Sequence, residues 1–168
     1  ENYPVNLFFT REGYFKKITP QSYRMSSEQY LKEGDQVVQH VEGGNADNLL
    51  FFTDCGQVYK AKACDFEDTK ASVLGDFVPA KLGMDEGESA IAMAVTADYQ
   101  GYMLFCFENG KVAKVNLNAY ETKTNRKKLL KAYSTREKLT AALCLHEDGQ
   151  ILLTASNGRL LLLPTALL

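Results

Sequence analysis

The sequence has few of the features that build membrane spans, disulfide frameworks or metal centres. No apolar run approaches the roughly 18 residues that a membrane-crossing helix needs, and the first residues do not form a signal peptide. The four cysteines form no C-x-x-C pair, and the two histidines stand apart from them. We therefore expect reduced, mostly buried thiols on strands, no disulfides, no metal site and no cofactor.

Recognised catalytic motifs are also missing. Neither His40 nor His146 lies beside a Ser or Cys nucleophile in a known motif, and no glycine-rich loop of the Walker type occurs. The pair Gly43-Gly44 fits a turn between repeats better than a phosphate loop. We expect a domain without catalytic residues.

Charge is segregated along a chain whose overall balance is close to neutral. The length of 168 residues, 45% apolar and 24% charged, is that of one globular domain. The net charge of -2 conceals an acidic stretch, 65–108, with nine acidic residues and two lysines. Residues 111–138 hold nine basic residues and two glutamates. Such segregation is typical of a face that meets a charged partner, although a merely solvated surface is the alternative.

Four glycines, Gly13, Gly56, Gly110 and Gly158, each end the same short phrase of an apolar run and a polar pair. They are spaced by 43, 54 and 48 residues, so the unit is about 48 residues long, typical of a radial β array. An aromatic lies ten residues past each of the first three glycines, and a lysine lies four past. The aromatics are Tyr23, Phe66 and Tyr120, and the lysines are Lys17, Lys60 and Lys114.

Each unit predicts a hairpin around its glycine, which we expect to have positive φ at Gly56, and then further strands. About four strands per unit give an all-β, propeller-like array. We expect units at 5–47, 48–100 and 101–148 and an incomplete one at 149–168. The stretch 128–133 fits a strand, although residues 125–133 could form a short helix, and a lone helical turn fits 26–31.

Aromatic residues at strand spacing predict the core of the array. They could be taken for a platform on which bases stack, but in strands such side chains are far more often buried. The residues concerned are Phe8, Phe9, Phe51, Phe52, Phe105 and Phe107.

The repeat phrase resembles one family. Residues 8–17, Phe-Phe-Thr-Arg-Glu-Gly-Tyr-Phe-Lys-Lys, and the acidic residue before Val-Val at 34–38 resemble the repeat of the C-terminal domain of the bacterial DNA gyrase A subunit, or of its topoisomerase IV counterpart. The resemblance implies a β-pinwheel whose blades exchange strands and whose basic rim binds duplex DNA. With three clear units and a truncated fourth, we expect a partial or shortened disc, or a dimer that completes the ring.

One departure from the family concerns tight wrapping of DNA. Gyrases that wrap DNA strongly carry a Gln-Arg-Arg-Gly-Gly-x-Gly box near the first blade, whereas residues 24–32 here have neither the arginine pair nor the glycines. A topoisomerase IV-like or degenerate member of the family therefore fits better than a full gyrase.

Two sets of basic residues are the predicted phosphate contacts. In the first set, three in-register lysines fall at equivalent rim positions of the repeat and three more flank them, whereas the second set lies in a variable loop. Lysines on edge strands can instead deter aggregation. The first set is Lys16, Lys17, Lys60, Lys62, Lys111 and Lys114, and the second is Lys123, Arg126, Lys127, Lys128 and Lys131.

The resemblance implies partners and a location. The partners are duplex DNA, the remaining domains of the A subunit, and the B subunit of the topoisomerase, and the location is cytoplasmic and nucleoid-associated. The sequence pI of about 5.7 favours a rival hypothesis, a propeller-type platform for protein interactions that binds no nucleic acid.

Overall fold

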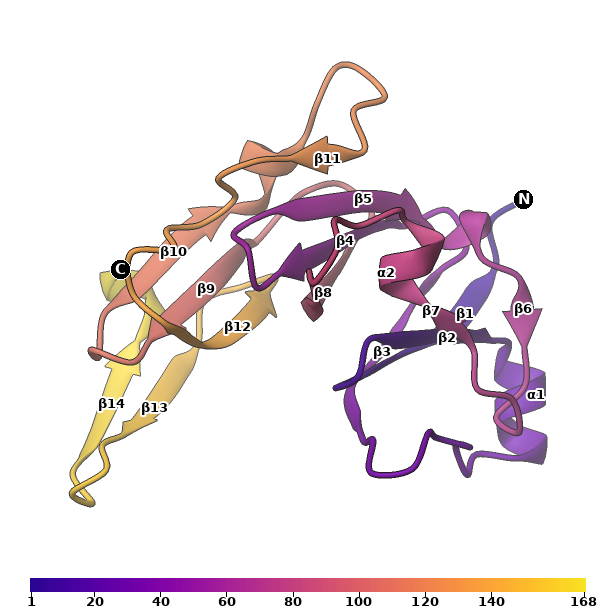
Figure 1. Ribbon diagram of the computed structural model, residues 1–168, viewed down its shortest axis with the longest axis horizontal. Helices are drawn as coiled ribbons and strands as arrows, with labels where there is room; N and C mark the ends of the chain where they lie inside the picture. The colour runs from indigo at the N-terminus through magenta and orange to yellow at the C-terminus, as the bar shows by residue number, and fades with distance from the viewer.

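The computed structural model describes residues 1–168 and consists mainly of β-strands. The strands form four sheets, and Figure 1 shows them following one another along an open arc from the N-terminal sheet to the C-terminal hairpin. The prediction of an all-β, propeller-like array is confirmed.

The first sheet takes the strands on one of its edges from a distant part of the chain. β1 (Pro4–Thr10) pairs antiparallel with β2 (Tyr14–Ile18) and with β3 (Val37–Gly44). On the free edge of β2, β6 (Asp68–Thr69) pairs in parallel and β7 (Asp76–Phe77) antiparallel. The segment that follows the second hairpin therefore completes the first sheet.

The second sheet repeats this arrangement. β4 (Asn48–Thr53) lies between β5 (Val58–Lys62) and β8 (Ala90–Thr96), all antiparallel. The free edge of β5 pairs with β11 (Lys128–Leu129), which comes from beyond the third hairpin. Strand exchange thus runs in the same direction at both junctions.

The last two sheets have fewer strands. In the third, β9 (Tyr102–Phe107) lies between β10 (Val112–Asn116) and β12 (Leu139–Leu145), and no strand pairs with the outer edge of β10. The fourth is the hairpin of β13 (Gln150–Thr154) and β14 (Leu160–Pro164). Each hairpin glycine has positive φ, from 73° to 93°, which confirms the turn predicted at Gly56.

Helical structure is short and lies between strands. α1 (Pro20–Met25) begins where the Thr19 hydroxyl accepts a hydrogen bond from the Ser22 N–H, with Pro at the first helical position. α2 (Val78–Lys81) follows β7, and 3₁₀ turns occur at 63–65, 117–120 and 165–167. No helix is both long enough and apolar enough to span a bilayer.

Three sequence expectations about local structure need correction. The lone helical turn expected at 26–31 is absent, and helix α1 lies just before that stretch. The strand expected over 128–133 is only two residues long. Gly43 and Gly44 end strand β3, and the turn begins at Asn45.

The core lies between neighbouring sheets. Phe9, Phe15 and Phe51 pack with Phe66 between the first and second sheets. Between the second and third, Phe52 meets the rings of Phe105 and Tyr120 edge-on at 5.5 and 5.1 Å. The predicted burial is confirmed for all six phenylalanines, which are Phe8, Phe9, Phe51, Phe52, Phe105 and Phe107.

The expectation of buried cysteines is only partly correct. Cys106 is buried on strand β9, and Cys144 is half-buried on β12. Cys55 and Cys64 are exposed, one in the hairpin turn and the other in a 3₁₀ turn. All four thiols are free.

Candidate nucleic-acid interface

Lys16 is a buried structural residue. Its side chain is 1% exposed, and its Nζ donates to the carbonyl oxygens of Tyr30, Ala71 and Val73 at 3.0, 3.1 and 2.8 Å. Desolvation by burial lowers the pKa of the ammonium to about 8. Lys16 cannot reach a phosphate in this structure, which corrects its prediction as a rim residue.

The in-register lysines occupy equivalent places, and two of them bind carboxylates of the protein itself. Lys17, 3% exposed, lies 3.2 Å from Asp68 and donates to the Asn45 side-chain oxygen at 2.6 Å. Lys114 lies 3.0 Å from Asp148. Burial of Lys17 corrects its prediction as an exposed rim residue. Lys114 stays partly exposed beside Asp148, and its contact with phosphate stays a prediction.

Lys60 is the exception among the three. Its Nζ donates to the Thr122 hydroxyl at 2.9 Å and lies 5.4 Å from the centre of the Tyr99 ring, but it forms no salt bridge. Desolvation by burial lowers the pKa of Lys60, and the negative charge of Glu121 partly opposes this effect. Lys60 is a half-buried cation without an ion-paired carboxylate.

Lys128, at the start of β11, is also engaged within the protein. It forms a salt bridge of 2.9 Å with Asp85, and hydrogen bonds to Asp85 and Tyr59 raise its pKa. Its charge is therefore shared with an acidic residue of the loop after α2.

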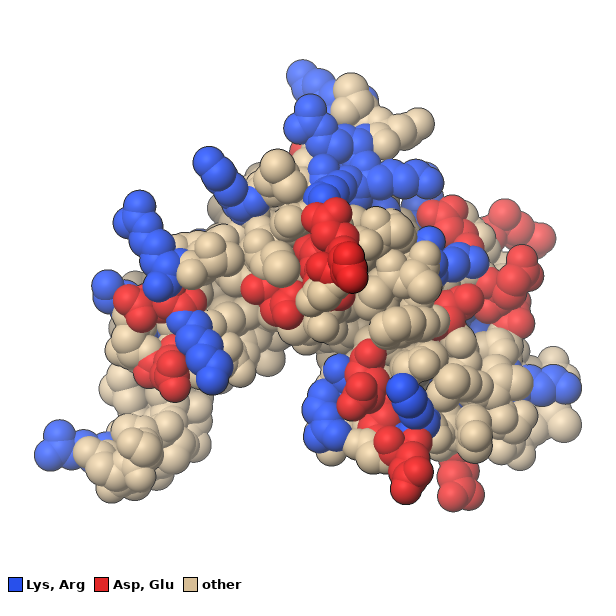
Figure 2. Space-filling model, viewed as in Figure 1, with Lys and Arg blue, Asp and Glu red and all other residues tan.

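The remaining predicted residues present their side chains to solvent. Figure 2 shows Lys and Arg side chains gathered over β11 and the loop that precedes it, whereas Asp and Glu are more numerous around the first sheet. Such a surface attracts polyanions over β11 and its loop and repels them around the first sheet. The exposed predicted residues are Lys62, Lys111, Lys123, Arg126, Lys127 and Lys131.

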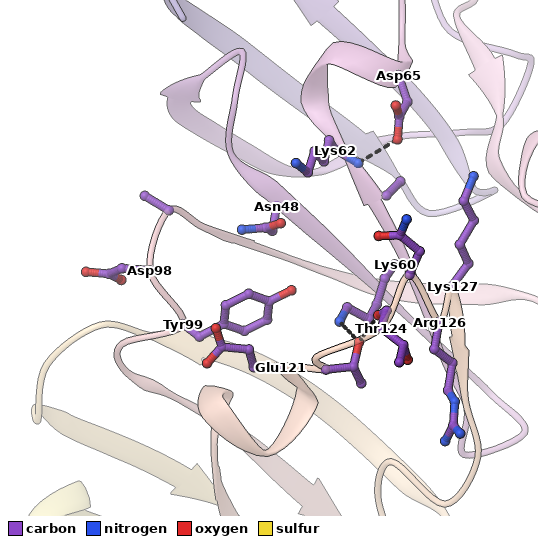
Figure 3. Close-up of a pocket in the computed structure, with 14 residues that line it drawn as sticks. Asn48, Lys60, Lys62, Asp65, Asp98, Tyr99, Glu121, Thr124, Arg126 and Lys127 are labelled. Atoms are coloured by element: carbon purple, nitrogen blue, oxygen red, sulfur yellow. Dashed lines mark hydrogen bonds between the residues drawn. The ribbon is translucent and has the colours of Figure 1, made fainter.

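A cleft of about 530 Å³ brings members of both predicted sets together, between the second sheet and the loops that precede and follow the first two strands of the third sheet. Lys60 and Lys62 reach it from β5, and Arg126 and Lys127 from the loop before β11. Hydroxyl and amide groups complete much of the lining (Figure 3), and the sequence did not single them out as functional. They belong to Asn48, Tyr99, Thr122, Thr124 and Asn125.

Three carboxylates also line this cleft. Asp98 accepts a hydrogen bond from the Gln100 N–H, and Asp65 accepts one from the backbone N–H of Lys62. Both lie toward the margins in Figure 3, whereas Glu121 lies beside Tyr99. No group of three or more His, Cys, Asp or Glu side chains is placed to hold a metal ion, in this cleft or elsewhere.

Known proteins with similar sequences are subunits of type IIA topoisomerases. A family model described as DNA gyrase C-terminal domain, beta-propeller, matches residues 47–73. The A subunit of DNA topoisomerase 4 from Staphylococcus aureus (strain MRSA252) is 25% identical over 159 residues, covering 92% of this chain and 20% of that protein. The A subunit of DNA gyrase from Mycobacterium bovis (strain BCG / Pasteur 1173P2) is 27% identical over 166 residues, with the same coverage.

Solved structures agree with the sequence comparison. The crystal structure of the C-terminal domain of DNA topoisomerase IV matches with a TM-score of 0.76 at 24% identity, over 96% of this chain and 52% of that one. The E. coli ParC C-terminal domain matches with a TM-score of 0.68 at 18% identity, over 97% and 65%. In sequence and fold, the chain therefore resembles the C-terminal domains of gyrase and topoisomerase IV A subunits.

The resemblance seen in the repeat phrase is thereby confirmed, and the fold is the β-pinwheel. The chain spans 20% of the length of the topoisomerase and gyrase subunits that it matches. Strands are exchanged at two junctions: β6 and β7 pair with β2 of the first sheet, and β11 pairs with β5 of the second.

Proposed function

We propose that this chain is a non-catalytic module that binds duplex DNA within the A subunit of a type IIA topoisomerase. Binding is tolerant of sequence, because the candidate contacts are flexible cations suited to phosphates rather than to base edges. The observation that carries the proposal is the gathering of exposed Lys and Arg over β11 and its loop on a pinwheel related to those subunits.

The proposed partners follow from the same relationship. The remaining domains of the A subunit supply strand cleavage, and the B subunit completes an ATP-dependent enzyme in the cytoplasm at the nucleoid. The pinwheel contributes DNA contact and guidance without a cofactor. The missing gyrase box favours a role like that of topoisomerase IV over tight wrapping.

A salt titration of DNA binding tests the proposal. A labelled duplex of about 40 base pairs is titrated with the chain at several salt concentrations, and anisotropy gives the affinity. We expect affinity to fall steeply with salt, with a logarithmic slope of roughly −0.9 per phosphate contacted. The triple variant Arg126→Glu, Lys127→Glu, Lys131→Glu is expected to lose affinity at least tenfold for every sequence alike.

A matched control separates local contact from overall charge. Arg24, Lys32 and Lys70 are also exposed but lie beside the first sheet, and reversing them changes the net charge by the same amount. We expect the control variant to lose much less affinity. Equal losses from the two triple variants would contradict the site, and absence of binding even at low salt would contradict the function.

One observation favours a second function, a platform for protein interactions. The C-terminal hairpin exposes leucines, with Leu152 at 59% and Leu162 at 57%, and exposed apolar patches often mark contact surfaces. A second copy that closes the open arc is the partner that we propose for this hairpin.

A further inference from the structure

The three in-register lysines differ in what they meet across the sheet junction. In the first sheet, Lys17 reaches Asp68 on the exchanged strand β6, at 3.2 Å. Asp68 lies twelve residues past the turn glycine of the next unit, Gly56. In the second sheet, Lys60 reaches the residue twelve past Gly110, and that residue is a threonine.

The position twelve residues past the turn glycine is therefore charged at the first junction, where it is Asp68, and neutral at the second, where it is Thr122. Where the first junction has an ion pair, the second has an ammonium held only by the Thr122 hydroxyl at 2.9 Å. Lys114, in the third sheet, again binds a carboxylate, that of Asp148. Lys60 is therefore the one in-register lysine whose charge is left uncompensated by a salt bridge.

The surroundings of Lys60 supply further groups that suit a phosphate. Lys62, Arg126 and Lys127 line the same cleft, and hydroxyl and amide donors lie between them (Figure 3). Asp65 and Asp98 lie toward the margins of the cleft, and Glu121 is the carboxylate whose charge acts on Lys60. Phosphate oxygens are stronger partners for such a cluster than a single hydroxyl.

We propose that this cleft is a phosphate subsite, in which Lys60 binds one backbone phosphate of duplex DNA. This inference rests on the proposed DNA-binding function and adds to it a particular contact. It places a fixed, half-buried anchor beneath the flexible cations of the loop before β11. The corresponding position in the first sheet is closed to DNA by Asp68.

Two variants test the subsite against the 40-base-pair duplex. Lys60→Gln removes the ammonium, and Thr122→Asp installs the carboxylate that the first junction carries. Each is expected to weaken binding three- to tenfold at low salt and to lower the magnitude of the salt slope by about 0.9, the contribution of one phosphate. Thr122→Asn, close in size to Asp but uncharged, is the control and is expected to retain the wild-type affinity and slope.

Folding is monitored in parallel, because a loss of structure would also weaken binding. Thr122→Asp creates an ion pair with Lys60, so we expect its melting temperature to equal or exceed that of the wild type. Lys32→Gln, a neutralised lysine near the first sheet, is expected to keep the wild-type slope.

The outcomes distinguish the subsite from the broader function. If the wild type binds the duplex and Lys60→Gln binds with the same affinity and salt slope, the subsite is overturned and the DNA-binding function stands. A wild-type chain that binds no duplex at any salt concentration would overturn both. Weakening by Thr122→Asn equal to that by Thr122→Asp would assign the effect to the lost hydroxyl and overturn the charge argument.

Discussion

At the scale of single residues, Lys16 is a basic residue of the repeat phrase that is buried in the interior. Its ammonium joins β2 to the Tyr30 carbonyl and to two carbonyls of residues 68–77, the exchanged segment whose strands β6 and β7 complete the first sheet. The Ala71 carbonyl also accepts from the Tyr30 N–H, whereas Lys16 is the donor to the other two. A burial of this kind needs every donor satisfied, and three acceptors match the three N–H bonds of an ammonium.

We expect Lys16→Met to lower the free energy of unfolding by about 2 kcal/mol, because carbonyls lose their partner although the apolar stem is kept. Urea unfolding at pH 7 measures the change. The control is Lys70→Met, an exposed lysine of the exchanged segment, which is expected to stay within about 0.5 kcal/mol of the wild type. Equal effects of the two substitutions would show that the buried contacts contribute nothing.

The pH dependence of the free energy of unfolding also tests the burial of the Lys16 ammonium. The pKa of Lys16 is about 8 in the folded chain and about 10.5 when exposed in the unfolded one. Above pH 8 the folded chain loses this proton first, so the free energy of unfolding rises with pH, by up to about 1.4 kcal/mol per unit. Between pH 8 and 9.5, we expect the wild type to gain stability relative to Lys16→Met. A constant difference across this range would contradict the assignment.

At the scale of elements, the exchanged segment 68–77 fits against the first sheet through a glycine. Gly75 has a φ of 92°, and a Cβ there would overlap the carbonyl oxygen of Phe15 and the side chain of Lys16. Gly83 has a φ of 63°, but a Cβ there would meet open space. The two glycines therefore separate backbone strain from steric overlap.

We expect Gly75→Ala to cost about 3 kcal/mol of unfolding free energy and Gly83→Ala about 1 kcal/mol, since both place a side chain on a left-handed backbone and only the first also clashes. Urea unfolding measures both values, and amide hydrogen exchange shows whether residues 68–77 lose protection in Gly75→Ala. Similar costs at the two positions would argue against close packing of the exchanged segment.

The elements differ in how far the sequence predicts them. Hairpins are predictable because a turn glycine and its flanking strands are local, and the phrase recurs around Gly13 and Gly56. The pairing of the exchanged strands is not, because β6, β7 and β11 have only two residues each and pair with strands about fifty to seventy residues away. Of the three, only β11 lies in a stretch that the sequence predicts as a strand. Helix α1 was missed although Thr19 and Pro20 are a helix-start signal.

The sequence predicts the candidate site in part: the positions of the lysines follow from a local pattern, but their burial and partners depend on residues far away in the chain. The in-phase lysines were visible in the sequence, but whether each is exposed depends on a residue of the next unit. Lys60 and Thr122 are separated by 62 residues, and the signal for their contact was the shared spacing of Asp68 and Thr122 from a turn glycine. Burial of Lys16 had no such signal, since its acceptors are backbone carbonyls.

At the scale of the whole molecule, the fourth sheet differs from the others in having only two strands. A lone hairpin is marginally stable in water, and β13 and β14 pair only with each other. Leu152 lies directly opposite Leu162, and Leu160 lies two residues from Leu162 on the same strand, so all three share one face. That face is 57–65% exposed at these positions, which is costly unless something covers it.

We expect the chain to self-associate with rising concentration through this face, because burying the leucines against a second copy removes apolar area from water. Sedimentation velocity over a range of concentrations measures the association. The double variant Leu160→Lys, Leu162→Lys is expected to remain monomeric, with circular dichroism showing that the strands persist. Val38→Lys, Val73→Lys makes the same chemical change at exposed positions of 44% and 41% around the first sheet, and we expect it to associate like the wild type. A wild-type chain that stays monomeric would argue against a second copy as the partner of this hairpin, and association that survives the leucine variant would place the contact elsewhere on the arc.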